Sequence, residues 1–222
     1  MRFGLDAAII DVDGTLLDTL PFWDEAPLRY LATLGLAGPP DLGKRMYHMS
    51  VEDGARYVHR QFAPHMTVRD ILAGQAGVIH QYYAEEAKPK PGACDFVRAL
   101  AGAGVELAIL TASRAEDVEA ALTRLGLRSL FTRLDTVDTL GVAKSDSLIF
   151  SQVAQHMGYE PSTILVADDD PQALAAAHAA GCITLGVYDP ASDARQQDVQ
   201  AFSDIYRSTL HSVDVIPLYG RV

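Results

Sequence analysis

The sequence predicts an α/β fold, in which a parallel sheet core is flanked by helices and an inserted helical domain follows the first strand. Short apolar runs, rich in β-branched residues and typical of fully buried strands, occur at residues 7–11, 105–111, 134–137, 163–168 and 183–188. Helical patterns separate the later runs, and this alternation implies a parallel sheet with helices on both faces. Residues 16–89 instead read as one helix after another.

Start and stop signals support the helices of the sheet domain. Each apolar helical face is bounded by residues that favour helix ends, and a glycine closes each one. The expected starts are Pro91, a capping box of Ser113 with Glu116, Ser145 or Ser147, and Asp170 followed by Pro171. Helices are therefore expected between the successive strands of the sheet.

The inserted segment has a helical pattern of its own. Apolar residues share a face in a first helix near residues 22–34, and two more helices are expected over residues 50–59 and 67–87. A chain of 222 residues suits one domain that carries an insertion. The predicted division is residues 1–15 and 90–222 for the core and residues 16–89 for the insertion.

Composition narrows the range of partners. The formal net charge is -11 and the pI is about 4.9, which argues against nucleic-acid binding because that needs clustered Lys and Arg. No apolar run approaches the ~18 residues of a membrane span, and the N-terminus lacks a signal-peptide pattern. Cys94 and Cys182 lack CxxC spacing and are expected to be buried thiols in a reducing compartment. We expect a cytoplasmic protein that binds neither nucleic acid nor membrane.

Two acidic side chains follow the first predicted strand directly, in the sequence DVDGT at residues 11–15. Open parallel sheets bind ligands beyond the carboxyl ends of their strands. Asp11 and Asp13, two residues apart in an extended chain, can point the same way, and Gly14 then permits a tight turn. A turn with two solvated acids is the alternative interpretation. The buried strand before the motif favours a functional site.

Further polar residues are expected at the same edge of the sheet. Thr111 ends the second strand, Lys144 precedes a helix, and Asp168 and Asp169 end a later strand. Carboxylates packed this closely repel each other unless a cation joins them, and ligands that are all oxygen suit Mg²⁺. Lys144 supplies a point charge that can hold both a phosphate and a nucleophile, and the Thr111 hydroxyl can donate to a phosphate oxygen.

This set of residues suits phosphoryl transfer. An aspartate nucleophile such as Asp11 forms an acyl-phosphate, which splits one difficult displacement into two easier ones. Asp13 can protonate the leaving oxygen and then deprotonate the attacking water. The sequence therefore predicts a Mg²⁺-dependent phosphatase that hydrolyses a small phosphorylated metabolite through an aspartyl-phosphate intermediate.

The sequence resembles the haloacid dehalogenase superfamily over nearly its whole length. Residues 11–15 match the first motif of the family, DxDGT, and Thr111, Lys144 and Asp168 with Asp169 match the later motifs in order. The layout is most similar to the β-phosphoglucomutase-like and phosphoglycolate phosphatase-like branch. The resemblance implies a Rossmann-like core and a small α-helical cap formed by the insertion, which closes over the site and selects the substrate.

The resemblance also implies roles for individual residues. The catalytic residues would be Asp11 as nucleophile, Asp13 as acid and base, Thr111 and Lys144. The residues expected to contact the substrate are Gly14, Thr15, Ala112 and Ser113. Mg²⁺ would be held by the side chains of Asp11 and Asp169, the backbone carbonyl of Asp13, and Asp168 as a second acidic contributor.

Other functions share parts of this pattern. Dehalogenases of the superfamily lack the second aspartate, so Asp13 argues against dehalogenation. A phosphonate hydrolase would use a cap lysine, for which Lys44 is the candidate. A phosphosugar mutase of the β-phosphoglucomutase type is the runner-up, although residues 48–53 lack the arginine that mutases commonly carry there. Phospho-receiver modules place the acidic pair before the acceptor aspartate, which is the reverse order, and a catalytically silent binding relative is a further alternative.

Overall fold

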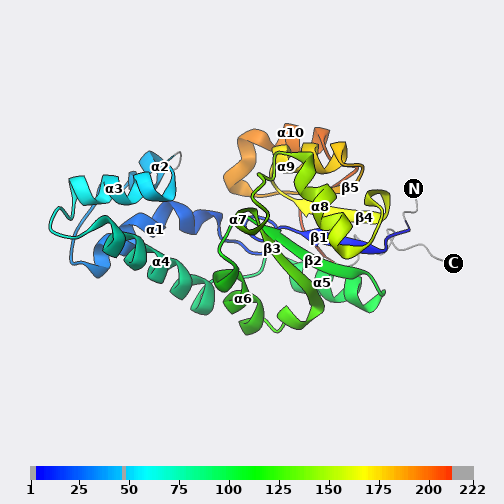
Figure 1. The fold of residues 1–222 in the computed structure, drawn as a ribbon, viewed down its shortest axis with the longest axis horizontal. Helices are drawn as coiled ribbons and strands as arrows, with labels where there is room; N and C mark the ends of the chain where they lie inside the picture. The colour runs from blue at the N-terminus through cyan, green and yellow to red at the C-terminus, as the bar shows by residue number, and fades with distance from the viewer. Residues whose placement is uncertain (1–3, 47–48, 212–222) are drawn as a thin grey trace. The chain divides into compact units, whose positions relative to one another are not determined.

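The computed structural model describes residues 4–46 and 49–211, which form two compact units (Figure 1). One unit comprises Met1–Asp18 and Lys88–Val222, and the other comprises Thr19–Ala87. The first unit contains a six-stranded parallel sheet with helices, and four helices make up the second among its described residues. The predicted α/β fold with a helical insertion is confirmed.

All strands of the sheet run parallel, in the order β3-β2-β1-β4-β5-β6. The strands are β1 Ala7–Ile10, β2 Glu106–Thr111, β3 Phe131–Thr136, β4 Ile164–Asp168, β5 Ile183–Val187 and β6 Ile205–Arg207. The chain runs outward from β1 to β3 and then crosses back to β4 on the other side of β1. The strand order therefore reverses at β1, which is where open parallel sheets bind ligands.

Helices cover both faces of the sheet, with α5 and α6 on one side and α8 and α9 on the other (Figure 1). The α-helices are α5 Ala93–Gly102, α6 Ala115–Arg124, α7 Val137–Leu140, α8 Ser147–Met157, α9 Pro171–Ala179 and α10 Gln196–Ala201. The described residues of the unit also form three 3₁₀ helices, η1 Arg128–Leu130, η2 Pro161–Thr163 and η3 Pro190–Arg195. No helix among the described residues is long and apolar enough to cross a bilayer.

The apolar core between the sheet and helices α8 and α9 explains why the strands consist of apolar residues. Alternate residues of β1, β2 and β4, such as Ile9, Leu110 and Val166, pack there with Phe150 of α8 and Ala173 of α9. All four residues of β1 are at most 1% exposed, because helices cover both faces of the strand. A strand buried on both sides needs no alternation of apolar and polar residues, which is why the run at residues 7–11 was readable as a strand.

The second unit consists of α1 Leu20–Thr33, α2 Leu42–Met46, α3 Val51–Gln61 and α4 Val68–Glu85. Its core includes Tyr30, Leu31 and Ile71. The side chains of Ser50 and Thr67 cap α3 and α4, close to the predicted starts of these helices. The five-residue helix α2, on which the Lys44 side chain is exposed, was not predicted.

Local signals failed at two other places. The predicted capping box was wrong: the N-cap of α6 is Arg114, with no side-chain hydrogen bond, and Ser113 bonds elsewhere. The start of α8 at Ser147, one of the two predicted positions, is confirmed, and its N-cap is Asp146, which accepts a bond from the Leu148 N–H. β3 begins three residues earlier than predicted, at Phe131. The predicted cap of α9 by Asp170 is present.

Candidate active site

The chain turns sharply beyond β1, in residues 11–17. The Leu17 N–H donates to the Val12 carbonyl at 2.7 Å, which closes the turn. The Asp11 N–H still donates to the Ala167 carbonyl of β4 at 3.0 Å, so Asp11 continues the pairing of the sheet. The Asp11 side chain therefore lies at the carboxyl edge, beside the end of β4.

Lys144 joins two of the predicted acidic residues. Its Nζ lies 2.6 Å from Asp11 Oδ1 and 2.5 Å from Asp168 Oδ2. Asp168 is the last residue of β4, and Lys144 lies between α7 and α8. The side chains of Lys144, Asp11 and Asp168 are 14%, 8% and 2% exposed, so the ion pairs are largely shielded from water. Removal of one partner from such a cluster leaves a charge buried without compensation.

Asp169 is held on both of its carboxylate oxygens. The Thr15 hydroxyl donates to Oδ1 at 3.2 Å, and the Ser192 hydroxyl donates to Oδ2 at 3.3 Å. Gly14, with φ of +85°, lies directly against this carboxylate, because a Cβ on Gly14 would be 2.7 Å from Asp169 Cγ. Glycine at this position therefore allows the carboxylate to rest on the backbone of the loop after β1.

Burial has the largest effect on the pKa values of the acids. Burial raises the pKa of Asp11 well above its ordinary value, Lys144 opposes this, and Asp168 and Asp169 add to it. Burial and then the charge of Asp168 raise the pKa of Asp169 to about 7. Burial alone would lower the pKa of Lys144, but Asp11 and Asp168 raise it above its usual value. Ionisation of all three acids would therefore place more negative charge here than Lys144 neutralises.

The end of β2 contributes hydroxyl groups. Thr111 is the last residue of β2 and is fully buried, and its Oγ1 accepts the Ser113 N–H at 3.0 Å. The Ser113 hydroxyl donates to Asp13 Oδ2 at 2.6 Å and so ties the second acid of the first motif to this loop. Ala112, between the two, is exposed. The hydroxyls of Thr15 and Ser113, two residues predicted to contact the substrate, thus bond to carboxylates.

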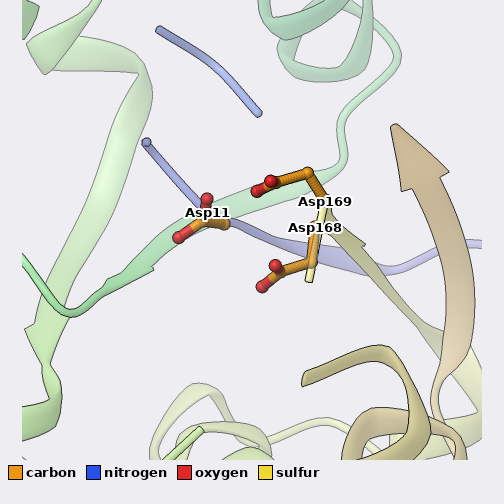
Figure 2. A group of neighbouring side chains, drawn as sticks. All are labelled: Asp11, Asp168 and Asp169. Carbon is orange, nitrogen blue, oxygen red and sulfur yellow. The ribbon is translucent and has the colours of Figure 1, made fainter. Parts of the chain in front are cut away.

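A cation would fit among three of the carboxylates. One oxygen from each of Asp11, Asp168 and Asp169 lies within 4.8 Å of the others, and the three side chains lie close together at the ends of β1 and β4 (Figure 2). Within residues 4–46 and 49–211 no other such group of three or more His, Cys, Asp or Glu side chains is present. The donors are all oxygen and carry excess negative charge, which is the environment that Mg²⁺ prefers.

Three polar residues near this site were not predicted. Ser192 contacts Asp169, and the buried pair Lys90 and Asp189 lies behind it. Only local patterns are visible in a sequence, and Ser192 lies 23 residues from Asp169 while Lys90 lies 99 residues from Asp189. A sequence signal existed only for Asp189, which is followed by proline and could have been read as a helix cap.

We expect Gly14→Ala to weaken cation binding by about tenfold or more, because the added Cβ displaces the Asp169 carboxylate. The positive φ adds strain of roughly 1–2 kcal/mol. Gly104→Ala is the matched control, since Gly104 has a φ of +81° but nothing within 4 Å of the added Cβ. Calorimetric Mg²⁺ titration and thermal melting measure both effects. Equal cation affinity in the two variants would contradict the contact argument.

Comparison with known proteins assigns the family. The haloacid dehalogenase-like hydrolases match residues 5–181. The chain belongs to this family. The predicted superfamily and the prediction of an enzyme of the hydrolase class are thereby confirmed.

Two relatives and the solved structure of another protein extend the comparison. Hexitol phosphatase B of Escherichia coli (strain K12) is 27% identical over 221 residues, 96% of this chain and 96% of the relative. The phosphoglycolate phosphatase of Pseudomonas putida is 31% identical over 187 residues, 81% of this chain and 68% of the relative. The crystal structure of CbbY from Rhodobacter sphaeroides in complex with phosphate has a TM-score of 0.77 at 21% identity and covers 96% of this chain and 99% of CbbY, which shows a shared fold.

Proposed function

We propose that this hydrolase is a Mg²⁺-dependent phosphatase that removes phosphate from a small metabolite through an aspartyl-phosphate on Asp11. The contact of Lys144 Nζ with Asp11 at 2.6 Å and with Asp168 at 2.5 Å carries the proposal. A fixed ammonium between two buried carboxylates can orient a nucleophile and attract a phosphate dianion to it. Phosphatase names among the relatives support the same reaction.

The proposed reaction has two steps. In the first, a carboxylate oxygen of Asp11 attacks phosphorus, and the bond from phosphorus to the substrate oxygen breaks as Asp13 protonates that oxygen. In the second, Asp13 takes a proton from water, the water oxygen attacks phosphorus, and the bond to Asp11 breaks. Inorganic phosphate leaves, and both carboxyl groups return to their starting states. The Ser113 hydroxyl, 2.6 Å from Asp13, orients this acid and base.

Other residues would hold the phosphoryl group and the cation. Lys144 and the Thr111 hydroxyl would donate to phosphoryl oxygens, with backbone N–H groups beside Gly14, Thr15, Ala112 and Ser113. Bound Mg²⁺ would neutralise charge on the phosphate and on the acids. Its ligands would be the side chains of Asp11, Asp168 and Asp169 and the backbone carbonyl of Asp13. The raised pKa values of Asp11 and Asp169 support this proposal, because a cation relieves the repulsion that raises them.

The helical unit Thr19–Ala87 is proposed as the cap that selects the substrate. The names of the relatives favour a phosphorylated sugar alcohol or phosphoglycolate as substrate. The runner-up, a mutase of the β-phosphoglucomutase type, has less support, since residues 48–53 contain no arginine. The first of these, His48, lies outside the described residues.

The test is phosphate release from a panel of phosphorylated metabolites in Mg²⁺ and in EDTA. The panel contains hexitol phosphates, sugar phosphates, phosphoglycolate and nucleotides. We expect release from one class well above the rest, complete loss in EDTA, and recovery when Mg²⁺ is added in excess. Full activity in EDTA would refute the proposed requirement for a divalent cation. Isomerisation of a sugar phosphate without net release of phosphate would instead identify a mutase.

A further inference from the structure

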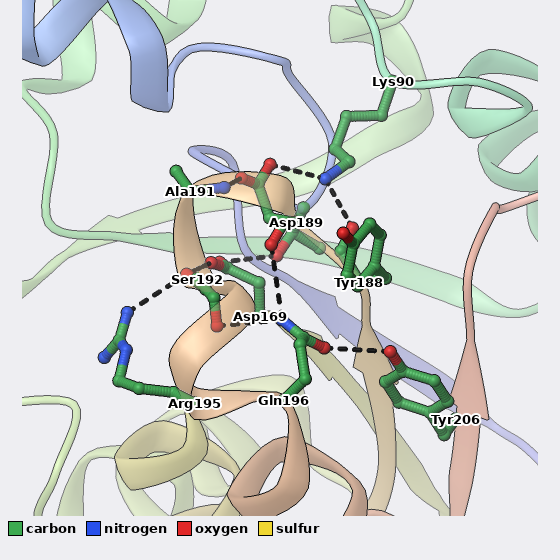
Figure 3. Close-up of polar contacts among 10 residues, drawn as sticks. Lys90, Asp169, Tyr188, Asp189, Ala191, Ser192, Arg195, Gln196 and Tyr206 are labelled. Carbon is green, nitrogen blue, oxygen red and sulfur yellow. Dashed lines mark hydrogen bonds and ion pairs between the residues drawn. The ribbon is translucent and has the colours of Figure 1, made fainter.

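The 3₁₀ helix η3, which follows β5, places one of its side chains on Asp169. Ser192 of η3 is 2% exposed, and its Oγ lies 3.3 Å from Asp169 Oδ2. The hydroxyl of Thr15, in the loop after β1, donates to the other oxygen of Asp169, Oδ1. The carboxylate is therefore held by two hydroxyl groups from residues far apart in the sequence (Figure 3 shows the Ser192 side).

Arg195 determines the direction of the Ser192 hydroxyl. A serine hydroxyl has one hydrogen to donate and lone pairs to accept. Arg195 Nη2 donates to Ser192 Oγ at 3.1 Å, and its Nη1 donates to Asp170 Oδ1 at 3.1 Å. Because Arg195 offers only donors, it must occupy a lone pair of the serine oxygen. The serine hydrogen is then available for Asp169, which as a carboxylate only accepts.

A buried ion pair holds the start of η3. Lys90 Nζ lies 2.6 Å from Asp189 Oδ2 and donates to the Tyr188 carbonyl at 2.7 Å. The side chains of Lys90 and Asp189 are 8% and 1% exposed. The other oxygen of Asp189 accepts the Ala191 N–H at 2.8 Å and so caps η3 (Figure 3). Asp189 therefore links Lys90 to the backbone turn that carries Ser192.

The far side of η3 is also fixed. Gln196 donates through Nε2 to the carbonyls of Asp189 and Ser192, at 3.4 and 3.3 Å. Its Oε1 accepts the Tyr206 hydroxyl of β6 at 2.9 Å. The backbone on both sides of the Ser192 side chain is thus bonded to groups outside the turn, which leaves the hydroxyl little freedom to move from Asp169.

We infer that Ser192 is a positioning residue, which Arg195 and the Lys90–Asp189 pair hold in place to orient the Asp169 carboxylate for cation binding. The inference rests on the proposed function, because it requires a cation at the acidic group. Hydrogen-bonding partners of metal ligands fix the orientation of those ligands, and their removal typically costs about 10- to 100-fold in metal affinity. Ser192 acts through Asp169 and does not touch the substrate.

The test compares Ser192→Ala with wild-type protein by titration with Mn²⁺, in which the free ion is measured by electron paramagnetic resonance. Competition then gives the Mg²⁺ affinity. We expect about 10- to 100-fold weaker binding by Ser192→Ala. In phosphatase assays the Mg²⁺ concentration for half-maximal rate should rise by a similar factor, while kcat at saturating Mg²⁺ stays close to wild type. A purely structural role would lower kcat at every Mg²⁺ concentration.

Two further variants make the result interpretable. Ser151→Ala, on the exposed face of α8, is the matched control and should bind Mn²⁺ like wild type. Arg195→Met tests the same mechanism at a side chain that is 45% exposed and whose loss the fold tolerates more easily. If Arg195→Met acted only by removing a positive charge, Mn²⁺ would bind more tightly. If it releases the Ser192 hydroxyl from its orientation, Mn²⁺ binds more weakly, and this is the result that we expect.

Unchanged Mn²⁺ affinity in Ser192→Ala, or tighter binding in Arg195→Met, would overturn the inference. In either case the proposed function stands if wild-type protein binds the cation and releases phosphate. Wild-type protein that binds neither Mn²⁺ nor Mg²⁺ would refute the cation-dependent function itself and the inference with it. Melting of each variant in EDTA verifies that the compared proteins are folded.

Discussion

Asp11→Asn should abolish phosphate release, with a fall in kcat on the order of 10⁴- to 10⁶-fold, as when other enzymes lose their nucleophile. An amide cannot act as the nucleophile that Asp11 provides in the proposed reaction. The substitution preserves side-chain shape, and Lys144 keeps its ion pair with Asp168, so the protein should remain folded. Rates on the best substrate of the panel and circular dichroism measure the two effects.

Asp198→Asn is the matched control for this variant. Asp198 is exposed on α10, so the same chemical change there should leave the rate unaffected. If the Asp11→Asn protein is folded, binds Mg²⁺ and still turns over at a tenth of the wild-type rate or faster, that result contradicts the role of Asp11 as the nucleophile.

Lys144→Met should have the second largest effect, because it removes both ion pairs of the site at once. Asp11 and Asp168 would be left buried without their positive partner, and such losses typically cost about 3–5 kcal/mol. Phosphate release should fall at least about 100-fold, since the ammonium also orients the nucleophile. The loss of stability should be largest in EDTA, because a bound cation compensates part of the missing charge.

Denaturant unfolding in EDTA and in Mg²⁺ gives the two stabilities. Lys88→Met is the control, since the Lys88 side chain is exposed and the substitution is the same. We expect the control to be as stable as wild-type protein, and Lys144→Met to lose stability that Mg²⁺ partly restores. Full stability of Lys144→Met in EDTA would show that the ion pairs at 2.5 and 2.6 Å do not support the fold.

The parallel sheet was predictable because strands that are buried on both faces consist of uninterrupted apolar runs. The central strand has four consecutive residues that are nearly inaccessible to water, and this run reads as a strand without further information. The short strand β6, Ile205–Arg207, has only one buried residue and leaves no such pattern. The five-residue helix α2 was missed for a similar reason, since it is too short to show a helical period.

The site was predictable mainly where its residues follow strand ends, and Lys144, which precedes α8, was predicted together with them. The motif at residues 11–15, Thr111, and Asp168 with Asp169 come directly after apolar runs, and a parallel sheet brings these ends to one edge. Side-chain pairing across the fold is different. Ser113 had the spacing of a helix cap, but its hydroxyl bonds to Asp13, 100 residues away. Local propensity cannot reveal such a partner, and the same holds for Ser192 and Lys90.

The most direct test of the central claim is to identify the residue that carries the phosphoryl group during turnover. Wild-type protein and the Asp11→Asn variant are mixed with the best substrate in Mg²⁺, quenched in acid and mapped by mass spectrometry. We expect one phosphoryl group on the wild-type peptide that contains Asp11, and none on the variant. Phosphate release by wild-type protein with the phosphoryl group on another residue, or with none on any peptide at any time of quenching, would contradict the claim.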